Sequence, residues 1–204
     1  QGKHGVKITS HASVVAETVQ KILDVTITWK IEAAGKIDAD IAVTKDDEFP
    51  DLPRFGVRMF LDKKLSAVRH FGMGPQESYC DKHQAASHGL YQANVDDLHE
   101  DYIRPQENGS HYDCEYVELN NSRYGIVVSA ENAFSFNASY YTQEELEEKT
   151  HNYELIESDS VVFCVDYALN GIGSNSCGPV VLEQYRFDDV LFRFQFTLIP
   201  YVKG

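Results

Sequence analysis

The sequence is short of basic residues and of long apolar runs, and each shortage argues against a class of partner. Its 18 Lys and Arg face 32 Asp and Glu, so the net charge is −14. Nucleic acids and anionic membranes both need clustered basic residues, which this chain lacks. No run approaches the ~20 apolar residues that cross a bilayer, and no signal stretch opens the chain. We therefore expect no nucleic-acid partner and no membrane partner.

Cysteine is also scarce. Cys80, Cys114, Cys164 and Cys177 are too few and too widely spaced for a disulfide scaffold or a CxxC metal site. We expect free thiols in a reducing compartment, and hence a cytoplasmic location. The chain opens on Gln1 and has no initiator Met, so we also expect a fragment or one subunit of a larger whole.

Strand periodicity dominates what is present. Apolar residues alternate with polar ones over 25–31 and 37–43, and Gly35 lies in the turn between them, which predicts a hairpin with one buried face. Four further runs, rich in β-branched and aromatic residues, predict strands at 54–61, 161–169, 180–187 and 190–199. Many short strands and frequent turns indicate an all-β fold, an antiparallel sandwich that occupies residues 1–204 as a single domain.

One segment has helical character. Thr142 is a suitable N-cap for the run QEELEE, and Glu145 follows three residues later in the capping-box arrangement. Its acidic first turn suits the positive end of the helix dipole. We predict a short surface helix of about two turns.

The middle of the chain, residues 70–119, is polar and irregular in pattern. This predicts a long loop region that is either functional or held against a partner. It contains five histidines, at His70, His83, His88, His99 and His111. Their spacing does not match two ligands on one helix face and no cysteine pair supports them, so we predict no metal site.

No catalytic set stands out from the residues. A nucleophile system around Ser78 and His83 would lack a GxSxG elbow. Several carboxylates could form a glycosidase pair, but an acidic domain always offers such pairs. Those considered are Glu77, Asp81, Asp113, Glu115 and Glu118.

Four ordered segments resemble one known family. GMGPQESYCDK resembles the GxGPxExYxDR signature in the C-terminal domain of bacterial β-galactosidases of glycoside hydrolase family 2. The matching residues are Gly72, Gly74, Pro75, Glu77, Tyr79 and Asp81, with Lys82 where Arg is common. Downstream segments that begin at Tyr102, Phe134 and Asp166 resemble three further motifs of that domain, in the same order: YIRPQENG, FSFNASYYTQEELEEKTH and DYALNGIGSNS. The resemblance covers essentially the whole chain.

The resemblance implies a large antiparallel β-supersandwich, similar to galactose mutarotases, and a retaining enzyme that hydrolyses terminal β-D-galactosides such as lactose. In that family the catalytic glutamates lie in a separate (β/α)8 barrel. This chain shows no alternating strand–helix pattern, and ~200 residues is the lower size limit of such a barrel. We therefore expect no catalytic residues here and no activity of the isolated chain. The family includes both separate small subunits and C-terminal ends of single long chains.

The resemblance also implies two kinds of site. The loop GIGSNSCGP resembles one that reaches the rim of the barrel's sugar pocket, so the expected substrate-binding residues are Gly173, Ser174, Asn175, Ser176 and Cys177. The aromatic residue that stacks on the aglycone sugar in part of the family falls on Cys177 here. An ordinary turn between strands is the alternative for this loop.

The two prolyl segments GPQESY and RPQENG are expected to meet the barrel domain. The interface residues would be Pro75, Gln76, Glu77, Tyr79, Pro105, Glu107 and Asn108. A turn network that is satisfied within its own loops is the alternative.

The expected partners are the catalytic barrel domain or large subunit, and a galactoside substrate reached through the rim loop. We expect no cofactor in this domain, and Mg²⁺ and Na⁺ are candidate ions of the parent enzyme's catalytic domain. The alternative function is an autonomous carbohydrate-binding or mutarotase-like module, which fold analogy alone supports. A third reading, an interaction domain with no link to sugar, has the least support from the motifs.

Overall fold

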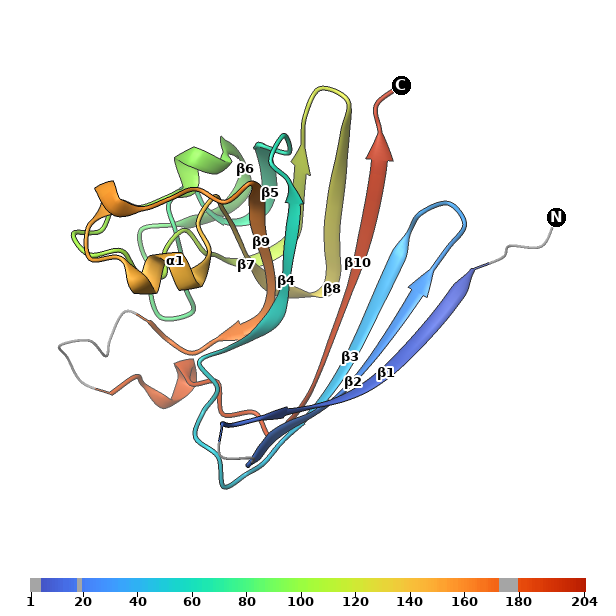
Figure 1. The fold of residues 1–204 in the computed structure, drawn as a ribbon, viewed down its shortest axis with the longest axis vertical. Helices are drawn as coiled ribbons and strands as arrows, with labels where there is room; N and C mark the ends of the chain where they lie inside the picture. The colour runs from blue at the N-terminus through green and yellow to red at the C-terminus, as the bar shows by residue number, and fades with distance from the viewer. Residues whose placement is uncertain (1–4, 18–19, 173–179) are drawn as a thin grey trace.

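The computed structural model describes residues 5–17, 20–172 and 180–204. Within them, ten strands and one short α-helix make the fold all-β and antiparallel, which confirms the predicted fold class (Figure 1). The strands are β1 (Val6–Val15), β2 (Lys21–Ile31), β3 (Ile37–Lys45), β4 (Arg54–Asp62), β5 (Ala67–Gly74), β6 (Ser87–Asn94), β7 (His111–Asn120), β8 (Tyr124–Ser139), β9 (Ser160–Leu169) and β10 (Leu191–Val202).

The strands form one continuous sheet that folds into two layers at β8. The main path runs β1-β2-β3-β10-β8-β7-β5-β6, and β9 joins β8 and carries β4 on its other edge. Side chains from β4 and β10 meet between the layers, where the rings of Phe55 and Phe192 pack edge to face with centroids 5.0 Å apart. The core therefore lies between the β4–β9 pair and the strands β2, β3 and β10.

The predicted hairpin is confirmed. β2 and β3 pair antiparallel, with Val25 opposite Val43 and Ile27 opposite Ile41. Gly35 lies in the turn with φ +93°, a conformation that glycine adopts without a steric penalty. The buried face continues on β10, whose three phenylalanines Phe192, Phe194 and Phe196 alternate with exposed polar residues. Each fully buried phenylalanine contributes about 1.5–3 kcal/mol.

The predicted helix is confirmed as α1 (Gln143–Glu148). The Thr142 hydroxyl accepts a hydrogen bond from the Glu145 amide at 3.1 Å, which satisfies one of the free donors of the first turn. Leu146 is buried, and the Gln143 side-chain amide reaches the Cys164 sulfur on β9 at 3.5 Å. The helix therefore covers the face of β9 that points away from the core.

The prediction of a long loop region over 70–119 is wrong. β5, β6 and β7 lie within or across it and pair with one another or with β8. Their pattern is hidden because His70, His111 and Glu118 take buried strand positions, where an alternation rule expects apolar residues.

The predicted strand over 180–187 is also wrong. That segment carries only a single 3₁₀ turn, η3 (Glu183–Tyr185). Both edges of β9 are already paired, one with β4 and the other with β8. Strand composition alone does not make a strand, because β-propensity depends on whether the run pairs with a neighbouring strand.

Two histidines lie side by side in the core. The rings of His70 on β5 and His111 on β7 have centroids 4.5 Å apart, and both donate a hydrogen bond to the Met73 carbonyl, at 3.3 and 3.2 Å. Burial lowers the pKa of His70 to about 4. Burial, and then the neighbouring His70, lower the pKa of His111 to about 3. Both rings are therefore neutral in the folded protein at neutral pH.

This pair predicts acid sensitivity. The unfolded chain protonates both rings near pH 6.5, whereas the folded protein does not, so the free energy of unfolding falls as the pH drops from about 6.5 towards 4. The expected slope is about 1.4 kcal/mol per pH unit for each histidine. Urea unfolding across this pH range measures it, with His111→Asn as the comparison. The variant should lose roughly half of the histidine slope; an unchanged slope would contradict this account.

Candidate functional site

Glu77 joins the two prolyl segments. Its carboxylate accepts hydrogen bonds from the Gly109 amide at 2.8 Å and from the Tyr79 hydroxyl at 3.2 Å. It also accepts from the Lys82 ammonium and the Tyr102 hydroxyl. Burial alone would raise the pKa of Glu77, but the donors Lys82, Tyr102 and Gly109 outweigh it and lower the pKa. Glu77 is therefore held as a carboxylate.

The second prolyl segment is fixed by Asn108 and Gly109. The Asn108 side chain accepts from the Glu100 amide at 3.0 Å and donates to the Gln106 carbonyl at 2.9 Å. Gly109 has φ +71°, and a Cβ there would lie 2.4 Å from the Leu98 carbonyl oxygen. Only glycine fits this position, which explains the Asn–Gly pair in the motif.

An ion pair ties this segment to the second layer. Arg54 on β4 donates two hydrogen bonds to Asp166 on β9, from Nε to Oδ1 at 2.8 Å and from Nη2 to Oδ2 at 2.6 Å. Its Nη1 reaches Glu107 Oε2 at 3.2 Å. Room for Asp166 requires Gly56, because a Cβ there would lie 2.1 Å from its Oδ1. Burial raises the pKa of Asp166 against the opposing charge of Arg54.

The seven predicted interface residues are therefore of two kinds. Pro75 and Gln76 are exposed on the surface. The other five point inward or bond within the domain: Glu77, Tyr79, Pro105, Glu107 and Asn108. The turn network that was the alternative reading is thus present, and the interface role stays a prediction.

Beside these loops, two large side chains point into solvent. Ile103 is 96% exposed and Tyr153 is 83% exposed. The Asn152 side chain donates to the Tyr102 carbonyl at 2.8 Å, so the loops that carry Ile103 and Tyr153 adjoin. We call these two residues the apolar tip. The loops hydrogen-bonded around Glu77 thus present an uncovered apolar surface.

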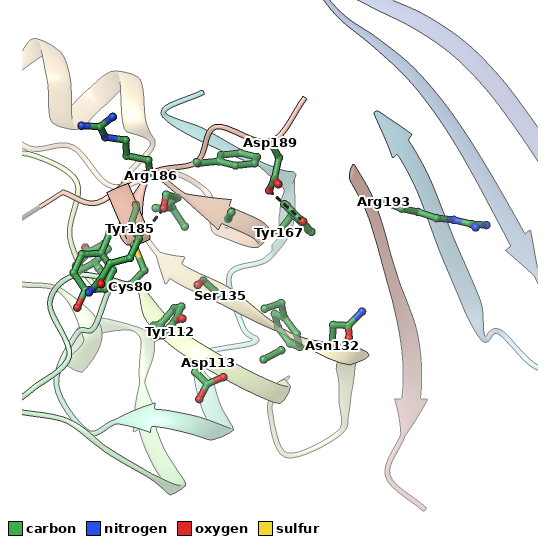
Figure 2. A pocket seen from close by; sticks show the side chains of 17 residues that line it. Cys80, Tyr112, Asp113, Asn132, Ser135, Tyr167, Tyr185, Arg186, Asp189 and Arg193 are labelled. Carbon is green, nitrogen blue, oxygen red and sulfur yellow. Dashed lines mark hydrogen bonds between the residues drawn. The ribbon is translucent and has the colours of Figure 1, made fainter. Parts of the chain in front are cut away.

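A pocket of about 430 Å³ opens where β8 changes its partner (Figure 2). β8 pairs with β10 as far as Ser129 and with β9 from Ser135, and Asn132 and Ala133 in the interval line the pocket. Four tyrosines line it: Tyr79, whose hydroxyl is bound to Glu77, and Tyr112 from β7, Tyr167 from β9 and Tyr185 from η3. Phe134 and Phe187 supply its apolar lining.

The pocket lining holds two aspartates, Asp113 and Asp189, and two arginines, Arg186 and Arg193. The Tyr167 hydroxyl donates to Asp189 at 3.4 Å, and burial, followed by the charge of Asp189, raises the pKa of Tyr167. Burial and then Asp113 raise the pKa of Tyr112 in the same way. Arg193 is bound by Asp40 on β3, with Nε 2.6 Å from Oδ1, and Figure 2 shows it pointing away from the pocket.

Asp113 has an uncommon backbone. Its φ is +55°, in a region that few residues other than glycine and asparagine or aspartate adopt. It lies in a β-bulge, since the register between β7 and β8 shifts between His111 and Cys114. Bulges re-aim side chains and are common beside functional sites. The Asp113 carboxylate lines the pocket and accepts no hydrogen bond from the described residues.

The sequence predicted neither the pocket nor most of its residues. Asp113 was considered only as one of several carboxylates, and Tyr112, Tyr167 and Tyr185 were not singled out. No local signal marks them, because they converge from three separate elements.

The predicted rim residues, Gly173 to Cys177, lie outside the described residues. The chain that leads to them is anchored: the Gly171 amide donates to the Tyr185 carbonyl at 3.2 Å, and the Ile172 amide to Asp81 Oδ1 at 3.2 Å. Asp81 belongs to the first signature segment, so this motif holds the start of the loop. Val180 and Leu182, just after it, are exposed at 67% and 63%.

Three observations complete the survey of sites. No group of three or more His, Cys, Asp or Glu side chains in the described part of the chain could hold a metal ion. Cys80, Cys114 and Cys164 are free thiols. Among the helices of the described residues, none is long and apolar enough to span a membrane.

The fold and the sites define an all-β domain with hydrogen-bonded prolyl loops, an uncovered apolar tip and a tyrosine-lined pocket. The family described as beta galactosidase small chain matches residues 1–198. The chain belongs to this family, which confirms the resemblance of its motifs.

Three curated relatives show how much of the family's proteins this chain represents. It is 46% identical to the beta-galactosidase of Actinobacillus pleuropneumoniae, 36% to that of Staphylococcus xylosus and 30% to that of Kluyveromyces lactis, over 199, 193 and 211 residues. These matches cover 98, 95 and 97% of the chain but only 19, 19 and 20% of the relatives. The chain spans about a fifth of the length of these relatives.

The Arg54–Asp166 ion pair predicts how the free energy of unfolding responds when these charges are removed singly or together. Asp166→Leu leaves Arg54 half-buried without its bidentate partner and should lower the free energy of unfolding by about 3 kcal/mol or more. Arg54 also binds Glu107, so the triple variant Arg54→Met/Asp166→Leu/Glu107→Gln, which removes all three charges, should recover a large part of this loss. Denaturant unfolding of the two variants and the parent measures the difference. Equal stability of single and triple variants would count against a dominant role of the unpaired charge.

Proposed function

We propose that the chain is the noncatalytic C-terminal domain or small subunit of a β-galactosidase, a retaining enzyme of glycoside hydrolase family 2 that hydrolyses terminal β-D-galactosides such as lactose. The observation that carries the proposal is the family match over residues 1–198, together with beta-galactosidase relatives of which the chain spans about a fifth. The rest of the enzyme, including the catalytic barrel, is its partner.

The engagement of the carboxylates supports a noncatalytic role. A retaining glycosidase needs two free carboxyl groups about 5–5.5 Å apart, one of them with a raised pKa. Glu77 is bound by Lys82 and Tyr102, and Glu118 by Arg69 and Tyr201. The catalytic glutamates then belong to the barrel, and the isolated chain is inactive.

Complementation tests the proposal. The purified chain is mixed with a β-galactosidase that lacks its C-terminal domain, and hydrolysis of o-nitrophenyl galactoside is assayed for the mixture and for each part alone. Activity is expected in the mixture only. Hydrolysis by the chain alone would refute the noncatalytic role, and an inactive mixture whose parts do not associate would refute the proposed partnership.

We place part of the partner interface at the apolar tip. Ile103 and Tyr153 are almost fully exposed, and the loops that carry them adjoin, so they offer apolar surface to a partner. The hydrogen bonds of Glu77 and Asn108 hold the loop that presents Ile103. The role of Glu77 is thus to shape the surface, and the tip makes the contact with the catalytic part.

A charge at the tip should break this contact. Ile103→Asp is expected to weaken association with the catalytic part about 30-fold, since a buried interface anchor carries 2 kcal/mol or more. Val202→Asp is the matched control: Val202 is 82% exposed and lies at the C-terminal end of β10, on the other side of the molecule from α1 (Figure 1). Affinity of the fragments, measured by calorimetry, reports the effect. Equal losses in both variants, or none in Ile103→Asp, would remove the tip from the interface.

We further propose that Gly173–Cys177 form part of the rim of the sugar pocket in the assembled enzyme. The anchoring of Gly171 and Ile172 and the exposed apolar pair Val180 and Leu182 support a loop placed against another surface. Galactoside substrate is then reached through this loop, with small polar groups and backbone in place of an aromatic ring.

Substitution of Cys177 tests whether this loop forms part of the rim of the sugar pocket. In the assembled enzyme, Cys177→Trp supplies a stacking ring and should lower KM for lactose about threefold or more, because aromatic stacking is worth about 0.5–1.5 kcal/mol. Cys177→Ser, which adds no ring, should leave KM unchanged. Steady-state kinetics with lactose distinguishes the two. If both variants behave like the parent, the loop does not reach the substrate.

The remaining assignments follow from the same proposal. This domain needs no cofactor of its own, and Mg²⁺ and Na⁺ belong to the catalytic domain of the parent enzyme. A cytoplasmic location suits the free thiols of Cys80, Cys114 and Cys164.

A further inference from the structure

We propose that the pocket at the branch of β8 is a binding site for a neutral saccharide. The proposal concerns the pocket itself, and it holds whether or not the chain assembles with a catalytic partner. It is carried by the shape of the pocket, by the free polar groups that line it and by the backbone of Asp113.

The size and lining suit a small sugar. A volume of about 430 Å³ lies in the range of small-molecule sites, about 300–1,000 Å³. Tyr112, Tyr167 and Tyr185 come from three different elements and surround the space (Figure 2). Tyrosine combines a flat apolar face, which packs on the C–H face of a pyranose ring, with a hydroxyl that bonds its oxygens.

The pocket also contains hydrogen-bond donors and acceptors that have no partner among the residues that the structure describes. The hydroxyls of Tyr112 and Tyr185 and the carboxylate of Asp113 have no hydrogen-bond partner among the described residues. A carboxylate accepts from two adjacent sugar hydroxyls at once, whereas a phenol both donates and accepts. These are the groups that a polyol ligand requires.

The charged residues of the site suit a neutral ligand, since two aspartates and two arginines line it. Asp113 and Asp189 line the pocket, whereas Arg193 is bound to Asp40 and points away from it. Arg186 donates its Nε–H to the Val181 carbonyl at 3.1 Å, and Figure 2 shows its guanidinium at the edge of the view, away from Tyr167. An anionic sugar would meet two carboxylates without a facing cation, so uronic acids and sugar phosphates are disfavoured.

The backbone of Asp113 is a second, independent observation. Its φ of +55° and the bulge around it cost free energy that the pairing of β7 and β8 would avoid with one residue fewer. The bulge places the carboxylate at the pocket, where the described protein gives it no bond. The bulge therefore costs free energy without giving the Asp113 carboxylate a hydrogen bond within the described residues, and this points to a ligand as its partner.

The same lining argues against sugar mutarotation as the activity of this pocket. That reaction would need a convergent acid and base, typically histidine and glutamate. No histidine and no glutamate is found among the described residues that line it. The pocket is therefore assigned to binding and not to catalysis.

Asp113→Gly is the decisive variant. Glycine adopts a positive φ freely, so the variant keeps the bulge and should melt at the same temperature as the parent or higher. It removes the carboxylate and with it the hydrogen bonds to the sugar. Glu115→Gln, an exposed acidic residue two positions further along β7 and outside the pocket lining, is the matched control.

The experiment is a titration of the isotope-labelled chain of 204 residues by amide NMR, with galactose, lactose and glucuronate as probes. We expect saturable shifts at Asp113, Ser135 and Tyr167 for galactose or lactose, with Kd about 1 mM or tighter. Asp113→Gly should bind at least about tenfold more weakly, with its melting temperature retained, and Glu115→Gln should bind like the parent.

Three results would overturn the assignment. The first is no saturable shift with either neutral sugar. The second is binding by Asp113→Gly as tight as that of the parent. The third is glucuronate bound as tightly as galactose, which contradicts selection by the carboxylates. If Asp113→Gly fails to fold, Tyr112→Phe replaces it: the ring stays, one hydroxyl is lost, and weaker sugar binding is again expected. Because the titration needs no catalytic partner, its failure leaves the complementation result untouched.

Discussion

The structure depends on one strand that serves two layers. β8 pairs with β7 on one edge, and on its other edge it pairs first with β10 and then with β9. Each of its backbone donors and acceptors must find a partner, so the change from β10 to β9 forces the layers apart over residues 130–133. The core fills the space between the layers, and the pocket occupies the mouth of the branch. The position of the candidate sugar site is thus a consequence of strand pairing.

The polar residues in the interior fix the arrangement of the loops and strands and do not form a reactive site. Glu77 and Arg54 each gather several partners from distant segments, and together they hold the two prolyl loops and the β4–β9 pair in place. A buried ion pair contributes little net stability compared with apolar packing, but it specifies one arrangement because any other leaves a buried charge unpaired. This fits the proposed role of the apolar tip, because a surface that meets a partner needs its loops held in one arrangement.

The prediction from sequence succeeded where a local rule was sufficient. The β2–β3 hairpin follows from alternation and Gly35, and α1 follows from the Thr142 cap. It failed over 70–119 because His70 and His111 are buried as neutral rings, and burial of a polar ring has no signature in hydrophobic periodicity. It failed over 180–187 because strand composition says nothing about whether a sheet edge is free. The motifs located Glu77 and Asn108, but whether they point to a partner or to their own loops was open from sequence.

The amino-acid sequence by itself determined the all-β class, the family, the single capped helix and the net negative charge, since each depends on composition, short-range spacing or an ordered set of motifs. Only the tertiary structure decided that Asp166 meets Arg54, that Tyr112, Tyr167 and Tyr185 surround one pocket, and that Asp113 faces it from a bulge. These contacts join residues from about twenty to more than a hundred positions apart, and their geometry is set by strand register and by the branch at β8, which no local pattern encodes.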